Sequence, residues 1–85
     1  MVKFYLKNVS EKRLRELMKK FVDESEWKYV RCWMVVDYIK GLYGSGGICE
    51  KWVYDELVKM GYEGFIEKGW LDIDYYYIVN NNGSE

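Results

Sequence analysis

One stretch decides the fold: Leu57–Val79, with the sequence LVKMGYEGFIEKGWLDIDYYYIV. Its first residues continue an apolar stripe of helical period, and Gly61 suits the left-handed residue that ends many helices. Two short runs rich in aromatic and β-branched residues follow, Phe65–Ile66 and Tyr75–Val79, and such runs favour strands. The stretch therefore predicts a helix that ends at Gly61 and then a β-hairpin with Trp70–Asp74 as its exposed connection.

The segment after Ser10 is predicted to be a helix of about three turns. Apolar residues recur there at the spacing of one helix face, at Leu14, Leu17, Met18, Phe21 and Val22. Ser10 is the expected N-cap, and Glu11 lies in the first turn, near the positive end of the helix dipole. We expect Leu17 to be fully buried together with Val36 and Leu57 of the later helices.

Two more helices are expected before the hairpin. The second is predicted from Glu26 to about Tyr43 with Ser25 as its cap. Its middle, Cys32–Val36, is apolar on every side, so burial on every side is expected. A strand is the competing assignment, but about 17 residues without a turn signal is long for a strand. The third helix is predicted over Ile48–Met60. Its core-facing residues should be Cys49, Val53, Leu57 and Met60.

These elements predict one α+β, mostly helical domain over residues 1–79. Val2–Lys7 alternates imperfectly and suits either a short N-terminal strand or a packed arm. Residues 80–85 are expected to form a disordered tail. Over residues 27–79 the helix-then-hairpin layout resembles small winged helix-turn-helix domains. The resemblance implies a module that binds DNA, RNA or another protein, with the third helix as the recognition helix and the hairpin as the wing.

Charge is balanced overall, with a formal net charge of −1, but it is uneven along the chain. Residues 1–21 carry seven basic and two acidic groups, whereas the remaining 64 residues carry six basic and twelve acidic groups. The solvent side of the first helix is predicted to form a basic ridge, which we define as Lys12, Arg13, Arg15, Lys19 and Lys20. Such a ridge suits phosphates or an acidic protein, and an ordinary solvated helix face is the alternative explanation.

The third helix has weak chemistry for reading DNA. Its predicted outer face consists of Lys51, Tyr54, Asp55, Val58 and Lys59, with Glu50 and Glu56 beside it. Base readout favours Arg, Asn, Gln, Ser and Thr, and carboxylates repel phosphate. The wing is acidic, with Glu63, Glu67, Asp72 and Asp74 in and around it. We expect Lys51, Tyr54 and Lys59 to touch phosphate or a partner, and the wing to stay out of any groove.

Catalytic and metal chemistry has little support in the residue types. The chain has no His, which removes Ser/His and Cys/His nucleophile pairs and histidine metal ligands. Asp72 and Asp74 would share a strand face and suit Mg²⁺, but acids beside turns are the commoner case. Gly41 and Gly46 have P-loop spacing, yet Gly47 and its neighbour stand where Lys and Ser/Thr are required. We therefore expect a non-enzymatic protein without a cofactor or metal.

The two cysteines, Cys32 and Cys49, are open to two interpretations. Ala, Thr, Gln, His and Pro are absent while Lys and Glu are abundant, which suits a hyperthermophile or its virus, or an A+T-rich genome. A disulfide is compatible with the first source and would contribute about 3 kcal/mol. Two buried, reduced thiols fit an ordinary cytosol. The chain has no apolar run of membrane-spanning length and no signal-peptide pattern, so a cytoplasmic protein without a membrane partner is expected.

Sixteen aromatic residues, nine Tyr, four Trp and three Phe, exceed what one small core should absorb. Tyr75, Tyr76 and Tyr77 are consecutive, so they cannot all face the core from one strand. Two functions follow. The first is a small DNA-binding regulator, archaeal or viral, whose basic ridge touches phosphates. The alternative is an accessory subunit that docks on a replication or transcription enzyme through aromatic side chains. The sequence leaves the oligomeric state open, a homodimer included.

Overall fold

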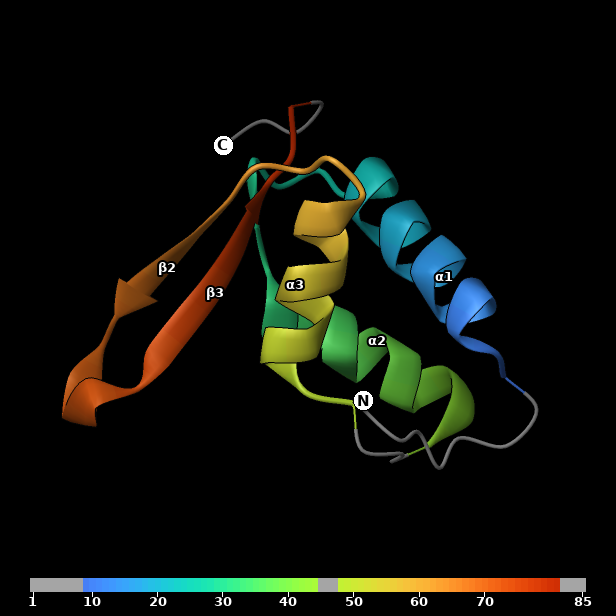
Figure 1. Cartoon of the computed structure of the whole chain (residues 1–85), viewed down its shortest axis with the longest axis horizontal. Helices are drawn as coiled ribbons and strands as arrows, with labels where there is room; N and C mark the ends of the chain where they lie inside the picture. The colour runs from blue at the N-terminus through green and yellow to red at the C-terminus, as the bar shows by residue number, and fades with distance from the viewer. Residues whose placement is uncertain (1–8, 45–47, 82–85) are drawn as a thin grey trace.

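Three helices and a three-stranded antiparallel sheet make up the computed structural model, which describes residues 9–44 and 48–81. The order is α1 (Glu11–Glu24), β1 (Tyr29–Arg31), α2 (Cys32–Tyr43), α3 (Glu50–Lys59), β2 (Gly64–Lys68) and β3 (Asp74–Val79), with a 3₁₀ turn, Trp70–Asp72, between the last two strands. The helices lie together on one side of the β2–β3 hairpin (Figure 1). The predicted α+β class is confirmed, while the expected N-terminal strand at Val2–Lys7 lies outside the described residues.

Helix α1 agrees with its sequence pattern. Ser10 is the N-cap, and its side chain accepts a hydrogen bond from the Arg13 backbone N–H at 3.1 Å. Leu14, Leu17, Met18 and Val22 are buried. Phe21 is partly buried, packed against the same core. The apolar stripe therefore fixes which side of α1 faces solvent.

The segment predicted to start the second helix is a strand instead. The helix expected from Glu26 begins only at Cys32, and Tyr29–Arg31 forms β1. Val30 of this strand lies opposite Ile78 of β3, and both side chains are fully buried. The prediction was wrong because β1 is stabilised by a strand far along the chain, which a local pattern does not reveal.

Burial of α2 is one-sided, which corrects the expectation of burial on every side. Val35 and Val36 are buried, but Trp33 is exposed. Ser25 does not cap this helix: it is the C-cap residue of α1, and its Oγ accepts a hydrogen bond from the Trp27 N–H at 3.1 Å. The helix packs against α1 and α3 and leaves its other side to solvent.

Helix α3 and the hairpin follow the predicted layout. Val53 and Leu57 are fully buried. Gly61 has a φ of 105°, the left-handed conformation that glycine adopts at little cost. In the hairpin, β2 and β3 are antiparallel, as expected, and Phe65 pairs with Tyr77. Strand β3 lies between β1 and β2, so the sheet depends on contacts from three separate parts of the chain.

Asn80 belongs to the packed structure, although the sequence assigns it to a tail. Its backbone N–H donates to the Lys28 carbonyl at 2.7 Å. Its side-chain amide donates to the carbonyls of Ser25 at 3.0 Å and Trp27 at 3.2 Å. Asn80 therefore ties the end of β3 to the segment that enters β1. Residues 82–85 of the expected tail lie outside the described residues.

The two cysteines do not form a disulfide, and only Cys32 is buried. Cys49 is exposed at the N-cap of α3, which corrects its expected inward orientation. Burial, with a smaller contribution from the nearby Glu50 carboxylate, raises the pKa of the Cys32 thiol to about 12. Since thiolates and not thiols react with alkylating agents, Cys32 should be inert in the folded protein.

We expect iodoacetamide at mildly alkaline pH to modify one thiol in the folded protein and two in the denatured protein. Peptide mapping by mass spectrometry should place the single modification on Cys49. Equal labelling of both cysteines in the folded protein would contradict the burial of Cys32.

Candidate functional site

The basic ridge lies on the side of α1 that faces away from the core. Lys12, Arg13, Lys19 and Lys20 are exposed, and Arg15 is half-buried. The structure thus brings the five predicted cations to one surface of the helix.

Acidic side chains neutralise most of this ridge. Three of its cations form ion pairs: Arg13 with Glu16 at 3.7 Å, Lys19 with Asp23 at 2.7 Å, and Arg15 with Glu11 at 3.3 Å and with Glu56 at 2.7 Å. Within the described part of the chain, Lys12 and Lys20 have no such partner. Because a neighbouring carboxylate cancels much of a cation's attraction for phosphate, the ridge is a weaker phosphate site than its composition predicts.

Glu56 is the acidic residue whose role the sequence interpretation missed. It is only 6% exposed, and it accepts hydrogen bonds from Arg15 Nε at 2.7 Å and Lys59 Nζ at 3.2 Å. The hydrogen bond from Arg15, supported by Lys59, holds the pKa of Glu56 below its ordinary value despite burial. The overlooked signal is spacing, since Glu56 follows the buried Val53 by three positions and so lies on the same side of α3. Arg15 and Lys59 are therefore engaged in joining α1 to α3.

A second polar cluster joins α1 to the loop after α3. The Tyr62 hydroxyl donates a hydrogen bond to Asp23, which also accepts one from Lys19 at 2.7 Å. Hydrogen bonds from Lys19 and Tyr62 lower the pKa of Asp23. Burial and the bond to Asp23 raise the pKa of Tyr62. Lys19 thus contributes to the fold and offers little free charge to a ligand.

The outer face of α3 is occupied by contacts within the domain. Lys51 bonds to Asp55 at 3.0 Å, and Lys59 bonds to Glu56. The Tyr54 ring packs beneath Gly64, where an added Cβ would lie 2.6 Å from the ring. Lys51, Tyr54 and Lys59, predicted to touch phosphate or a partner, are therefore held by contacts within the chain itself.

The side of the sheet that turns away from the helices carries a cluster of rings. Phe65 and Tyr77 stack with their centroids 4.8 Å apart, and Tyr29 meets Phe65 edge to face at 5.7 Å. Arg31 lies 5.7 Å from the Tyr77 ring centroid and Lys28 lies 5.6 Å from that of Tyr29, both in cation–π geometry. We call these five residues the aromatic face. It joins residues from all three strands.

Strand alternation explains why these rings point outward. Val30 and Ile78 point toward the helices and are fully buried, so their neighbours Tyr29 and Tyr77 point to the opposite side. Tyr76 packs on the helix side, against the ring of Tyr54 at 5.3 Å. The expectation that the three consecutive tyrosines cannot all face the core is confirmed. The helices in Figure 1 leave the other side of the hairpin uncovered.

The hairpin tip is the most exposed apolar part of the described chain. Trp70 is 85% exposed and Leu71 is 87% exposed. Leu71 and Asp72 have left-handed φ angles of 56° and 59°, and the Ile73 N–H donates to the Trp70 carbonyl at 3.1 Å. Left-handed backbone costs a residue such as Leu about 1–2 kcal/mol. The turn therefore holds two large apolar side chains in water at some cost, which is typical of an interaction site.

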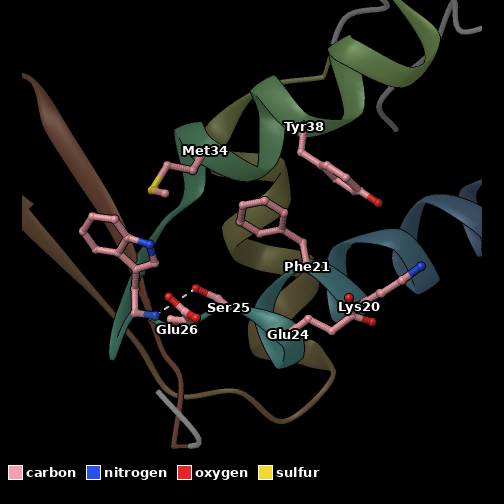
Figure 2. A pocket seen from close by; sticks show the side chains of 8 residues that line it. Lys20, Phe21, Glu24, Ser25, Glu26, Met34 and Tyr38 are labelled. Atoms are coloured by element: carbon pink, nitrogen blue, oxygen red, sulfur yellow. Dashed lines mark hydrogen bonds between the residues drawn. The ribbon is translucent and has the colours of Figure 1, made fainter. Parts of the chain in front are cut away.

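A cleft of about 280 Å³ opens between α1 and α2 (Figure 2). Phe21 and Tyr38 lie side by side in its lining, with ring centroids 5.1 Å apart. The remaining lining residues are Lys20, Glu24, Ser25, Glu26, Trp27 and Met34. Aromatic walls with charged residues around them suit a side chain of a bound protein.

The described residues show neither a metal-binding cluster nor a membrane-spanning helix. No group of three His, Cys, Asp or Glu side chains among them is arranged to hold a metal ion. Across residues 9–44 and 48–81, every helix is too short or too polar to cross a bilayer. Comparisons with protein-family models, curated proteins and solved structures give no match.

Proposed function

We propose that this protein is a non-enzymatic, winged-helix-type module that docks on a larger protein of a nucleic-acid-processing complex. The aromatic face is the observation that carries the proposal, because three rings on an open sheet surface, with Tyr29 and Tyr77 both packed against Phe65, are costly to leave in water. Tyr, Phe and Arg are also enriched at protein interfaces. Three helices followed by an antiparallel hairpin support the winged-helix class, with the hairpin as the wing.

Electrostatics favours a protein partner over duplex DNA. Five of the seven cations expected to bind phosphate are in ion pairs: Arg13, Arg15, Lys19, Lys51 and Lys59. In the wing, Lys68 is paired with Asp74 at 3.7 Å, and Glu67 and Asp72 are exposed. The partner should present an apolar surface to the rings and carboxylates to Lys28 and Arg31, whose charges the described residues leave without an ion pair.

Alanine substitution tests this docking surface. Once a partner has been isolated with the tagged chain from its host cells, Phe65→Ala should weaken binding at least about tenfold, as expected for a central interface ring. Leu42→Ala is the matched control, since Leu42 is 52% exposed on α2. Titration calorimetry with the purified partner would measure both. Equal affinities for the two variants would contradict docking through the aromatic face.

Single-stranded nucleic acid is the second candidate. Lys12 and Lys20 are unpaired within the described chain, and rings beside Lys28 and Arg31 can stack on bases. In that case Lys12→Glu with Lys20→Glu should reduce the slope of log K against log salt by about two charges. Lys40→Glu, another exposed lysine, serves as the control. Fluorescence anisotropy with labelled oligonucleotides provides the measurement, and absence of any salt-dependent binding would eliminate this candidate.

A further inference from the structure

Strand β2 is an edge strand, because the sheet order β1-β3-β2 leaves one of its sides open. In Figure 1 the hairpin extends away from the helices with β2 on its outer side. Open strand edges commonly carry Lys, Pro or bulges that discourage pairing with another chain. Here the middle residue is Ile66, which is 52% exposed, and the chain has no Pro. Lys68, at the end of the strand, is in an ion pair with Asp74 at 3.7 Å.

The hydrogen bonds of the hairpin show which backbone groups the open edge presents. The Val79 N–H donates to the Glu63 carbonyl and the Gly69 N–H donates to the Ile73 carbonyl, both at 2.8 Å. Both bonds fit the register that pairs Ile66 with Tyr76. In an antiparallel ladder every second residue bonds to the partner strand, so the odd-numbered residues of β2 bond to β3. The N–H and C=O groups of the even-numbered residues therefore point outward: Gly64, Ile66 and Lys68.

We propose that two copies of this chain form a two-fold symmetric dimer by antiparallel pairing of their β2 edges, with Ile66 opposite Ile66 of the second copy. A two-fold axis perpendicular to the sheet must pass through the centre of the pairing. Centred on Ile66, the pairing places each Gly64 opposite the other Lys68, so all three outward-facing residues of both strands form ladder bonds. A pairing centred on Lys68 would instead place the Lys68 side chains of the two copies directly opposite each other, and it would pair fewer residues.

Side chains agree with this register. Phe65 lies opposite Glu67 of the second copy, so like charges do not meet directly across the strands. The two exposed Ile66 side chains cover each other. Because the axis is perpendicular to the sheet, the aromatic faces of both copies lie on the same side of the joined sheets. Dimer formation thus brings two copies of the proposed docking surface onto one side of the joined sheets, with Phe65 of each copy beside the seam, and it is independent of what that surface binds.

Substitution of Ile66 by charged residues tests the dimer. Wild-type protein should sediment as a dimer in analytical ultracentrifugation, whereas Ile66→Lys and Ile66→Glu should each raise the dimer Kd at least about tenfold, because two like charges meet at the axis. An equimolar mixture of the two variants should dimerise again. Ile73→Lys is the matched control, since Ile73 is 51% exposed near the tip on the far side from the β2 edge, and it should remain dimeric.

Three results would overturn the proposal: a wild-type monomer at the highest soluble concentration, dimers that persist in both position-66 variants, or a mixture that stays monomeric. Amide hydrogen exchange gives an independent measure on the unmodified protein. Protection of the Ile66 amide should rise with protein concentration, while that of Phe65 and Glu67, which bond to β3, should not. Concentration-independent exchange at Ile66 would equally overturn pairing through this edge.

Discussion

Leu57→Ala is expected to lower the free energy of unfolding by about 2–5 kcal/mol, the range for truncating a buried leucine. Leu57 is fully buried, with an exposed fraction of 0%, and it belongs to the core cluster that joins all three helices to Val30 and Ile78. Truncation removes apolar contacts from that cluster and leaves a cavity. In a domain of this size the total stability is about 5–15 kcal/mol, so the loss is a large part of it.

Urea denaturation followed by circular dichroism would measure the change. Val58→Ala is the matched control, because Val58 is the next residue on α3 and is 42% exposed. Its cost should be within about 0.5 kcal/mol, as for most surface substitutions. A cost that small for Leu57→Ala would contradict the orientation of α3.

Glu56→Gln is expected to cost about 1–3 kcal/mol at neutral pH, the range for losing a hydrogen bond between charged groups. The lower part of that range applies because the Arg15 side chain is 40% exposed and solvent screens its charge. The substitution leaves Arg15 and Lys59 without their shared carboxylate between α1 and α3.

Stability should also depend on pH through Glu56. Its pKa is lower in the folded protein than the ordinary value of about 4.3 for an unfolded chain. The contribution of the carboxylate is therefore fully present above about pH 4.3 and is lost as the pH falls through the lowered folded value. The difference in unfolding free energy between wild type and Glu56→Gln should shrink as the pH falls below that range.

Glu16→Gln is the control for the pH series. Glu16 pairs with Arg13 at 3.7 Å, and both side chains are 56% exposed, so the pair should contribute at most about 1 kcal/mol. Denaturation curves at several pH values would compare the variants. An equal and pH-independent effect of both substitutions would contradict a special role of Glu56.

The candidate binding surfaces were only partly predictable. The apolar stripe of α1 predicts that the ridge residues face solvent, and they do. Most of the ion pairs that neutralise these cations join residues three or four positions apart on one helix, such as Arg13 with Glu16 and Lys19 with Asp23, and helical spacing predicts such pairs. The pair between Arg15 and Glu56 joins α1 to α3, and spacing along the chain does not reveal it. The three consecutive tyrosines indicate an outward ring, but its grouping with Tyr29 and Phe65 requires the pairing of β1 with β3.

The sequence alone determined those elements whose capping residues, apolar spacing or turn residues lie within a few positions of each other. Ser10 capping α1, the stripe that ends at Val22, and the hairpin after Gly61 all depend on spacing, capping or turn chemistry, which act over one or two turns of chain. Tertiary structure alone decided that Tyr29–Arg31 is a strand and that Asn80 is buried. Both depend on hydrogen bonds between residues that lie more than half of the chain length apart. Those bonds stabilise a backbone conformation for which the local sequence has no clear preference.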